Sequence, residues 1–274
     1  MTATETPKIA LTHLTKLFGR RPAAALAMAE QGAGKAEILA ATGCTLALRD
    51  ISLSVAAGET CVLMGLSGSG KSTLVRHINR LIEPSSGGIA VDAMDVRALD
   101  ALALRDFRRH HVSMVFQGFG LLPHLDILAN VAFGLIARGE DPANAHATAM
   151  TWIHAVGLDG YEKARPDALS GGMKQRVGLA RALAVDTDII LMDEAFSALD
   201  PLTRADMQDL LLDLQTRLRK TIVFVTHDLD EAVRLGDRIV IMKDGVIVQA
   251  STPDDILHHP ADDYVARFVA IRNR

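Results

Sequence analysis

Short apolar runs alternate along the chain with segments that have helical spacing. Residues 51–55 alternate apolar and polar positions, as a half-buried strand does. Other runs have the length of buried strands: 60–64, 89–91, 112–116, 189–192, 222–225, 239–242 and 246–249. Because fully apolar strands are typical of sheets covered on both faces, the pattern predicts an α/β fold around a parallel sheet. An antiparallel patch is expected around residues 51–55 and 89–91, and Lys243-Asp244-Gly245 predicts a hairpin turn.

Helical segments lie between these strands. Apolar residues between 74 and 82 repeat at helical spacing, Ser170 can cap a helix over residues 173–184, and Asp141-Pro142 begins another helix. The region from about 120 to 175 is interpreted as a helical subdomain inserted into a single domain that spans residues 1–274. Residues 19–47 form an alanine-rich insertion with two helix-compatible stretches, interpreted as a surface addition without an assigned chemistry.

Composition favours an intracellular protein that does not bind nucleic acid. The 274 residues carry a net charge of −4 with acids and bases interspersed, whereas nucleic-acid binders usually show a strongly basic face. A small basic cluster at residues 105–111 fits a solvated helix end better, because no aromatic side chains interleave with it. Cys44 and Cys61 suggest neither disulfides nor a metal site, and no apolar run approaches the ~20 residues that span a bilayer. We expect any membrane association to come through a partner.

A phosphate-binding loop carries the clearest chemistry in the chain. Its residues are Gly65-Leu66-Ser67-Gly68-Ser69-Gly70-Lys71-Ser72, the pattern G-x-x-x-x-G-K-S between an apolar strand and a helix. Glycines let the backbone curl around an anion, and the loop amides with the helix N-terminus attract phosphate. Lys71 is predicted to reach the β- and γ-phosphates, and the Ser72 hydroxyl to ligate Mg²⁺. The alternative is a glycine-rich turn with a surface lysine.

Several polar residues follow predicted strands directly. They are Gln117, Asp193, Glu194 and His227, and the phosphate loop follows a strand in the same way. Ligands of parallel α/β sheets bind outside the carboxyl ends of the strands. We therefore expect these residues to converge on one nucleotide site.

A second glycine-rich cap lies at Ser170-Gly171-Gly172, before the helix expected at residues 173–184. A helix N-terminus preceded by glycines is also suited to an anion. Two phosphate-binding half-sites in one chain suggest that two copies pair head to tail, each completing the pocket of the other. The alternative is a cap that binds nothing.

These motifs, in this order, resemble the nucleotide-binding subunits of ABC transporters over nearly the whole chain. Gly65–Ser72 resembles the Walker A loop, Gln117 the Q-loop glutamine, and residues 169–175 the LSGGQ signature, with Met173 where glutamine is usual. Residues 189–194 resemble Walker B, residues 197–200 the D-loop, and His227 the switch histidine. The resemblance implies ATP hydrolysis with Mg²⁺ in a dimer of two copies.

The resemblance also implies a role for each motif residue. Glu194 would polarise the attacking water and His227 would contact the γ-phosphate. Ser72, Gln117 and Asp193 would hold Mg²⁺. The phosphate-loop residues would bind the phosphates of the nucleotide, and Phe18 would stack on its adenine. The alternative for Phe18 is packing in the core. The remaining nucleotide contacts would come from Thr73, Ser170, Gly171, Gly172, Gln175 and Asp200.

A narrower resemblance concerns the cargo. Residues 194–202, 79–84, 227–232 and the insertion are similar to ATP-binding subunits that import glycine betaine, proline betaine or choline. The same pattern leaves open a small amino acid such as proline or histidine. Many such subunits carry a pair of regulatory CBS domains at the C-terminus. We expect no such pair within residues 1–274. The implied partners are a membrane permease and, indirectly, a solute-binding protein, with the subunit peripheral on the cytoplasmic face of the inner membrane.

Two other classes stay open at this stage. One is an ABC-type ATPase that serves DNA repair or the ribosome, although no sustained heptads lie between Ser72 and Ser170 and only one ATPase unit is present. The other is a P-loop kinase, which would not need the second cap at residues 169–175.

Overall fold

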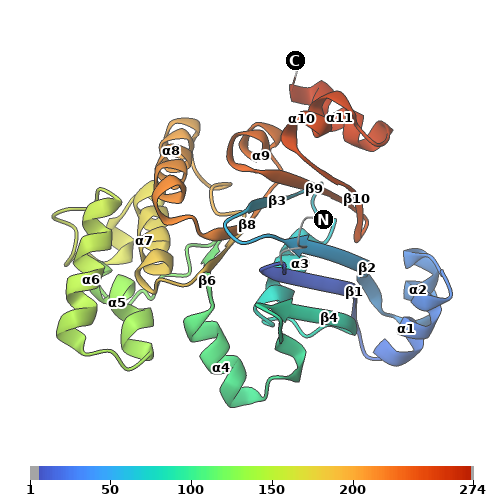
Figure 1. Ribbon diagram of the computed structural model, residues 1–274, viewed down its shortest axis with the longest axis horizontal. Coiled ribbons are helices and arrows are strands. Elements are labelled where there is room, and N and C mark those ends of the chain that lie inside the picture. Colours follow the sequence, from blue (N-terminus) through green and yellow to red (C-terminus); the bar gives the residue numbers. More distant parts are fainter. Residues whose placement is uncertain (1–5, 273–274) are drawn as a thin grey trace. The chain divides into compact units, whose positions relative to one another are not determined.

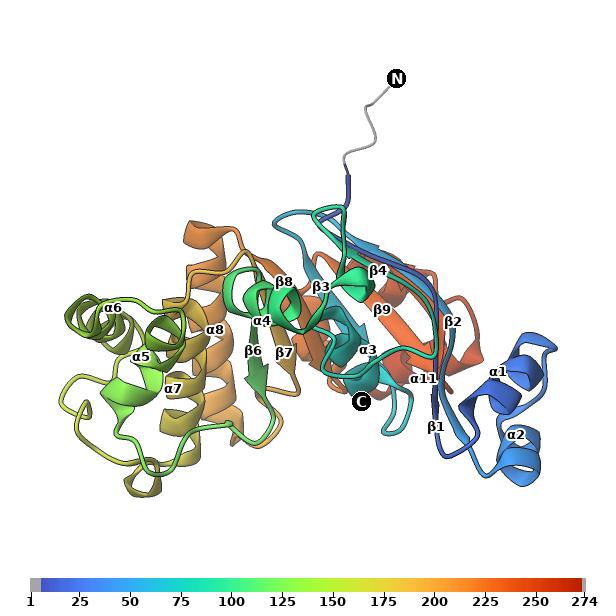
Figure 2. The ribbon, with the colours of Figure 1, turned by 90° about the horizontal axis from the view of Figure 1, so that it is seen from below.

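The computed structural model describes residues 6–272, which form two compact units. Unit 1 holds the described residues up to Asp100 together with those from Val225 onward, and unit 2 holds Ala101–Phe224. The expected helical segment at about 120–175 lies inside unit 2, with strands and helices of that unit on either side. Figures 1 and 2 show the elements of both units.

An antiparallel sheet forms one part of unit 1. Its strand order is β2-β1-β4-β5, with β1 Ile9–Phe18, β2 Thr45–Val55, β4 Ser86–Val91 and β5 Met94–Asp95. The first strand pairs antiparallel with both β2 and β4, so that Ile9 lies opposite Val55 and Val91. All three side chains are buried, because alternate residues of a strand face the same side of the sheet. The alternating apolar pattern predicted this antiparallel patch.

A second group of strands in unit 1 carries the phosphate loop. The order is β10-β9-β3, with β3 Thr60–Met64, β9 Arg238–Lys243 and β10 Val246–Ser251. Strands β3 and β9 are parallel, and β9 and β10 form an antiparallel hairpin. Asp244 and Gly245 have φ values of 51° and 81°, which confirms the Asp-Gly hairpin turn. Cys61 is buried in β3, and burial raises the pKa of its thiol to about 12, consistent with a packing role.

The helices of unit 1 follow these strands. They are α3 Lys71–Ile78, η1 Val96–Ala98, α9 Leu229–Leu235, α10 Pro253–His258 and α11 Asp263–Arg272. Helix α10 begins at Pro253, where the Thr252 hydroxyl caps it by accepting the Asp255 N–H over 3.3 Å. Helix α11 packs against α9 and α10.

The expected insertion consists of two short helices, α1 Pro22–Glu30 and α2 Lys35–Thr42. They lie side by side past the ends of β1 and β2 (Figures 1 and 2). Ala25, Ala29 and Ile38 form a small core with residues of the sheet. Strand β2 starts at Thr45, before residue 47 where the insertion was expected to end, because Leu46 is a buried sheet residue.

Unit 2 combines strands with a helical cluster. Its elements are α4 Ala101–His110, β6 Val112–Phe116, α5 Ile127–Ala137, α6 Pro142–Ala155, η2 Pro166–Ala168, α7 Gly171–Ala184, β7 Ile189–Asp193, α8 Pro201–Leu218 and, at its boundary, β8 Thr221–Thr226. The strand order is β8-β7-β6, with β6 and β7 parallel. Helices α5, α6 and α7 enclose a core that includes Ile127, Val131 and Ile153, and Trp152 packs against it.

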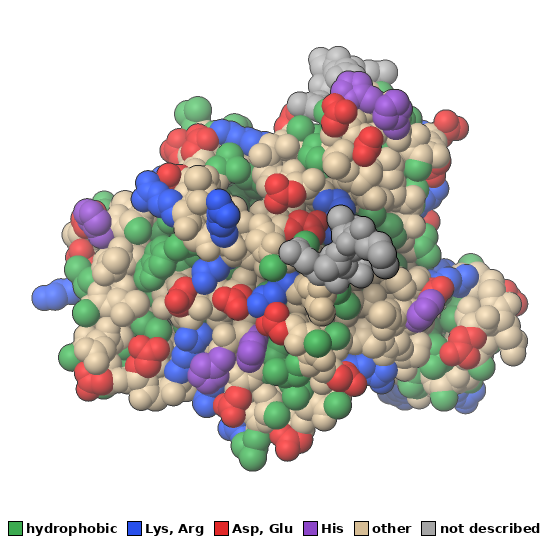
Figure 3. Space-filling view, in the orientation of Figure 1, with side chains coloured by type: hydrophobic (Ala, Val, Ile, Leu, Met, Phe, Trp, Pro, Cys, Tyr) green, Lys and Arg blue, Asp and Glu red, His purple; other side chains and the backbone are tan. Residues whose placement is uncertain are grey.

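The surface shows no single dominant charge on the face drawn in Figure 3. Lys and Arg side chains alternate there with Asp and Glu over the described residues. Arg108, Arg109 and His110 form the last turn of α4, where the helix dipole favours cations. This placement favours the solvated helix end over a nucleic-acid site. Among residues 6–272, no helix combines the length and the apolar character needed to cross a membrane.

Candidate functional site

The glycines of the phosphate loop adopt the backbone that the motif requires. Gly65, Gly68 and Gly70 have φ values of 149°, 78° and 104°, which side chains other than glycine rarely tolerate. A Cβ on Gly65 would collide with the Met242 carbonyl, whereas one on Gly68 would meet only open space. The loop therefore packs tightly at its start and faces outward at Gly68, where an anion can approach.

Lys71 is buried at the first position of α3, with 4% of its surface exposed. Its ammonium donates to the Gly65 carbonyl over 2.8 Å and to the Leu66 carbonyl over 3.1 Å. The lysine thus lies inside the loop and neutralises carbonyl dipoles there. A triphosphate offers the same ammonium stronger, charged acceptors.

The β9–β10 turn supports the loop from behind. The Gly245 N–H donates to the Ser69 carbonyl over 3.0 Å, and the Arg49 N–H of β2 donates to the Gly245 carbonyl over 2.8 Å. A Cβ on Gly245 would collide with the Ala47 carbonyl. Within unit 1, these contacts connect the phosphate loop and the β9–β10 turn to strand β2 of the antiparallel sheet.

In unit 2, strand register places Gln117 beside Glu194. Phe116 and Asp193 are paired in the parallel strands β6 and β7, and the two polar residues follow them directly. The Gln117 carboxamide nitrogen donates to the Glu194 carboxylate over 3.1 Å. Asp193 is buried, with 2% exposure. The sequence-based expectation that strand ends bring these side chains together holds for this pair.

Glu194 has an unusual backbone. Its φ is 48°, in the left-handed region, and its carbonyl accepts both the Ser197 N–H, over 3.2 Å, and the Ser197 hydroxyl, over 2.9 Å. Left-handed backbone at a residue other than glycine costs on the order of 1–3 kcal/mol and concentrates at functional sites. The same hydroxyl lies 3.5 Å from the Gln117 carboxamide nitrogen. Ser197 therefore holds the backbone turn from which the Glu194 side chain extends.

The second cap begins α7 at Gly171, two residues before the expected start at 173. The Ser170 hydroxyl accepts the Met173 N–H over 3.3 Å, and Ser170 is exposed. A Cβ on Gly172 would collide with Thr203 of α8, so this glycine is needed for packing within unit 2 as well as for any anion. Gln175 is fully buried, and Asp200 caps α8 by accepting the Thr203 N–H over 3.1 Å.

Arg181 of α7 connects this helix to the segment after Gln117. Its guanidinium donates to the Gly120 carbonyl over 2.6 Å and to the Phe119 carbonyl over 3.3 Å. Burial lowers the pKa of this guanidinium. Arg181 is thus a supporting residue that sequence reasoning did not select, whereas Ser197 was noted only as the first residue of the D-loop resemblance, with no role of its own. The position of Ser197, three residues after Glu194, was a usable local signal for a turn, whereas Arg181 gave none.

Phe18 lies at the end of β1 with 43% of its surface exposed, so it is not a core residue. The Lys16 ammonium lies 4.8 Å from the centroid of its ring. Phe18 also lines a hollow of about 520 Å³ with Pro22 of α1 and Pro84. An exposed ring beside a hollow can stack on a planar ligand.

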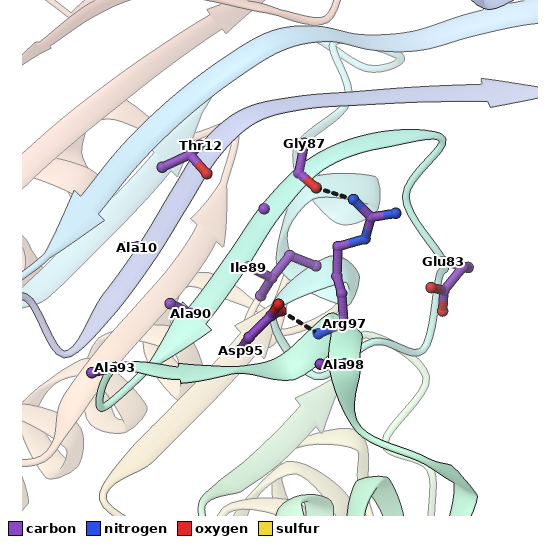
Figure 4. A pocket seen from close by; sticks show the side chains of 11 residues that line it. Ala10, Thr12, Glu83, Gly87, Ile89, Ala90, Ala93, Asp95, Arg97 and Ala98 are labelled. Atoms are coloured by element: carbon purple, nitrogen blue, oxygen red, sulfur yellow. Dashed lines mark hydrogen bonds between the residues drawn. The ribbon is translucent and has the colours of Figure 1, made fainter.

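Another pocket lies on the antiparallel sheet, and none of the predicted site residues lines it (Figure 4). Its polar groups bond to one another, since the Asp95 carboxylate accepts the Arg97 N–H over 2.9 Å and the Arg97 guanidinium donates to the Gly87 carbonyl. Small residues such as Ala10 and Ala90 line it too, with Glu83, whose carboxylate accepts the Arg80 guanidinium over 2.7 Å. This pocket presents no convergent set of reactive groups.

The residues present fit a nucleotide with Mg²⁺. The buried hydroxyl of Ser69 has no hydrogen-bond partner among residues 6–272, and it lies inside the phosphate loop. Hydroxyl, carboxamide and carboxylate oxygens, as Ser72, Gln117 and Asp193 offer, are ligands that Mg²⁺ prefers. With its nitrogen engaged by Glu194, Gln117 has its carboxamide oxygen left for a cation.

The predicted site residues fall into two groups. Unit 1 contains Phe18, the loop Gly65–Ser72, Thr73 and the exposed His227, and unit 2 contains Gln117, Asp193, Glu194 and the cap at Ser170–Gly172 with Gln175 and Asp200. Within unit 2, the structure joins Gln117 to Glu194. Within unit 1, it joins Lys71 to its own loop.

Comparisons with known proteins identify related chains. A family model described as "ABC transporter" matches residues 48–197. The glycine betaine/proline betaine transport system ATP-binding protein ProV of Escherichia coli (strain K12) is 52% identical over 95% of this chain and 65% of its own length. The glycine betaine/carnitine transport ATP-binding protein GbuA of Listeria monocytogenes is 54% identical over 96% of this chain and 66% of its own length. The chain therefore spans just under two thirds of these two relatives.

A third relative and a solved structure agree with this. The trimethylamine N-oxide transport system ATP-binding protein TmoW of Ruegeria pomeroyi is 51% identical over 96% of this chain and 77% of its own length. A dimeric ATP-binding cassette in a post-hydrolysis state, bound to ADP and Pi, superimposes with a TM-score of 0.76 at 32% identity, covering 89% of this chain and 98% of that one. The predicted α/β fold of ATP-binding cassettes is thereby confirmed.

Proposed function

Because the chain belongs to the ABC transporter family, we propose that it binds and hydrolyses ATP to power the import of a small quaternary amine. The observation that carries the proposal is the phosphate loop itself. Its outward-facing Gly68 and the buried Lys71 and Ser69 form a cradle whose polar groups suit phosphate.

Unit 1 residues bind the triphosphate in this proposal. The Lys71 ammonium, held beside the carbonyls of Gly65 and Leu66, reaches the β- and γ-phosphates, and the loop amides with the α3 N-terminus surround them. Phe18 stacks on the adenine, which its exposure supports. His227, exposed at the end of β8, contacts the γ-phosphate.

Unit 2 residues activate the water. Glu194 orients and polarises it for in-line attack on the γ-phosphorus, the bond from that phosphorus to the ADP oxygen breaks, and inorganic phosphate leaves. Gln117 holds the carboxylate by its hydrogen bond, and Ser197 holds the backbone carbonyl of the same glutamate. Ser72, Gln117 and Asp193 would hold Mg²⁺, which when bound neutralises charge on the β- and γ-phosphates.

Dimerisation completes the site. The cap at Ser170, Gly171 and Gly172, together with Asp200 at the start of α8, contacts the nucleotide of a second copy, and the second copy returns the contact. The dimeric solved cassette supports this arrangement. ATP then joins two chains, and hydrolysis separates them.

The cargo and the membrane partners follow from the relatives. ProV and GbuA, by their names, serve glycine betaine with proline betaine or carnitine, so we assign this chain a quaternary amine such as glycine betaine, proline betaine or choline. A permease binds the subunit on the cytoplasmic face of the membrane, near Leu121, Leu122 and Pro123, and a solute-binding protein delivers the amine. A cysteine introduced at Leu121 is expected to crosslink to the co-expressed permease.

The test is ATP hydrolysis by the purified chain over a range of protein concentrations. We expect the rate per molecule to fall on dilution, and Lys71→Ala to remove both binding and hydrolysis. A wild-type chain that does not bind ATP would refute the function. A rate per molecule that is independent of concentration in a strict monomer would refute the shared site.

A further inference from the structure

The phosphate loop is also contacted by the helix α11, 198 residues away in sequence. The Tyr264 hydroxyl donates to the Met242 carbonyl over 3.2 Å and accepts the Leu66 N–H over 3.4 Å. The ring is partly buried, meets Phe268 edge-on at 5.2 Å between centroids, and has the Lys243 ammonium 4.9 Å from its centroid. The hydroxyl is therefore held in place between the loop and the end of β9.

The Leu66 N–H belongs to the same peptide group as the Gly65 carbonyl. That carbonyl accepts the Lys71 ammonium over 2.8 Å, so the peptide is bonded at both of its polar ends. Turning the peptide over would break both bonds at once. Tyr264 thus opposes a flip that would point an N–H, instead of a carbonyl, at the lysine.

The surroundings leave the start of the loop little other freedom. Met64 pairs with Ile241 in the parallel strands, so Gly65 lies against Met242, and only glycine fits there. Val265, next to Tyr264, is fully buried and anchors α11. The Met242 carbonyl is therefore a fixed point that both the loop and the tyrosine contact.

We infer that Tyr264 is a positioning residue for the phosphate loop: its hydroxyl fixes the Gly65–Leu66 peptide so that the Gly65 carbonyl faces Lys71. The loop is then already ordered when phosphate arrives, and less ordering entropy is lost on binding. The consequence is that Tyr264 sets the affinity for ATP and leaves the chemical step alone. The inference rests on the proposed nucleotide-binding function of this loop.

Tyr264→Phe tests the inference, because it removes the hydroxyl and keeps the ring. We expect the Kd and the KM for ATP to rise about threefold to tenfold, the worth of one hydrogen bond, with kcat unchanged within about twofold. Tyr161→Phe is the matched control, since Tyr161 is the only other tyrosine, exposed and in unit 2. Calorimetric titration of ATP into the whole chain and steady-state kinetics measure these quantities.

Amide hydrogen exchange of the ATP-free chain gives a second readout. We expect the Leu66 amide to exchange faster in Tyr264→Phe, with the amides of Cys61–Met64 unchanged. Faster exchange throughout β3, unchanged exchange at Leu66, a wild-type Kd, or a fall in kcat at constant KM would each overturn the role of Tyr264. A wild-type chain that fails to bind ATP refutes the proposed function instead, so the two failures are distinguishable.

Discussion

Phe116 of β6 and Asp193 of β7 are paired neighbours in a parallel sheet, and this pairing places the next residue of each strand within hydrogen-bond distance of the other. Those next residues are Gln117 and Glu194. Parallel strands end at one edge of the sheet, so a one-residue extension of each is enough to build the contact. In the proposed mechanism Glu194 activates the water and Gln117 holds its carboxylate. Substituting each residue alone tests the two roles separately.

Glu194→Gln should separate binding from hydrolysis. The amide can still bond to its neighbours but cannot polarise water as a carboxylate does, so we expect kcat to fall by about 10²–10⁴-fold while ATP binding is retained. ATP should then hold two copies together, which size-exclusion chromatography with light scattering measures. Glu30→Gln, an exposed residue at the end of α1, is the control. Full turnover in Glu194→Gln would contradict the role assigned to this carboxylate.

Gln117→Glu should change the pH dependence of hydrolysis. It places a second carboxylate about 3 Å from Glu194, and two such groups share one proton because the like charges repel. The pKa of one carboxyl is then raised, so the ionised Glu194 is lost as the pH falls through that raised value. We expect the acidic limb of the kcat profile to move to higher pH.

Gln117→Met provides the comparison, because it fills similar space without a charge or a hydrogen bond. It should lower kcat without moving the limb. If Gln117→Glu left the acidic limb at the wild-type pH and Gln117→Met left kcat at the wild-type value, the contact between residues 117 and 194 would have no catalytic consequence.

The sequence could predict those parts of the site that neighbouring residues determine, and it could not predict contacts between residues far apart in the chain. The loop Gly65–Ser72, the cap at Ser170 and the Asp244-Gly245 turn each follow from residues within a single motif, and the structure has all three, with α7 starting two residues earlier than expected. Tyr264 and Arg181 were not found, because their contacts join residues 198 and 61 positions apart with no periodic signal. Gly172 was interpreted as room for an anion, whereas the contact with Thr203 depends on how α8 packs.

His77 should make the fold sensitive to acid. It is fully buried in α3, its Nδ1 lies 2.6 Å from the Thr73 carbonyl, and burial, with a smaller contribution from the Lys16 charge, lowers its pKa from 6.5 to about 4. The Thr73 hydrogen bond and Glu83 oppose that shift. Since the unfolded chain binds this proton below about pH 6.5 and the folded chain only near pH 4, stability is fully present above that range and falls as the pH drops through it.

His77→Asn should remove this dependence, because the amide can still donate to Thr73 but does not titrate. Urea unfolding at several pH values between 4 and 7 should show a slope smaller by up to roughly 1.4 kcal/mol per pH unit than in wild type. The exposed His124→Asn controls for the loss of an imidazole. Equal slopes in wild type and His77→Asn would show that another group causes the acid sensitivity.

Ser170→Arg should abolish hydrolysis and leave ATP binding by the single chain intact. The exposed Ser170 caps α7, and loss of a cap costs only about 1 kcal/mol, which Ser170→Ala measures by itself. The arginine adds bulk that blocks the nucleotide of the second copy. A collapse of ATP binding in dilute Ser170→Arg would mean that this serine acts within its own chain.

Mixing two inactive variants decides between these arrangements. Lys71→Ala lacks a working loop and keeps the cap, whereas Ser170→Arg lacks the cap and keeps the loop. In a two-fold dimer their mixed pair contains one complete site, so an equal mixture should recover up to about one quarter of the wild-type rate if sites act independently. Recovery should grow with protein concentration as mixed dimers form. If each site drew both the loop and the cap from one chain, no mixture of these two variants would hydrolyse ATP.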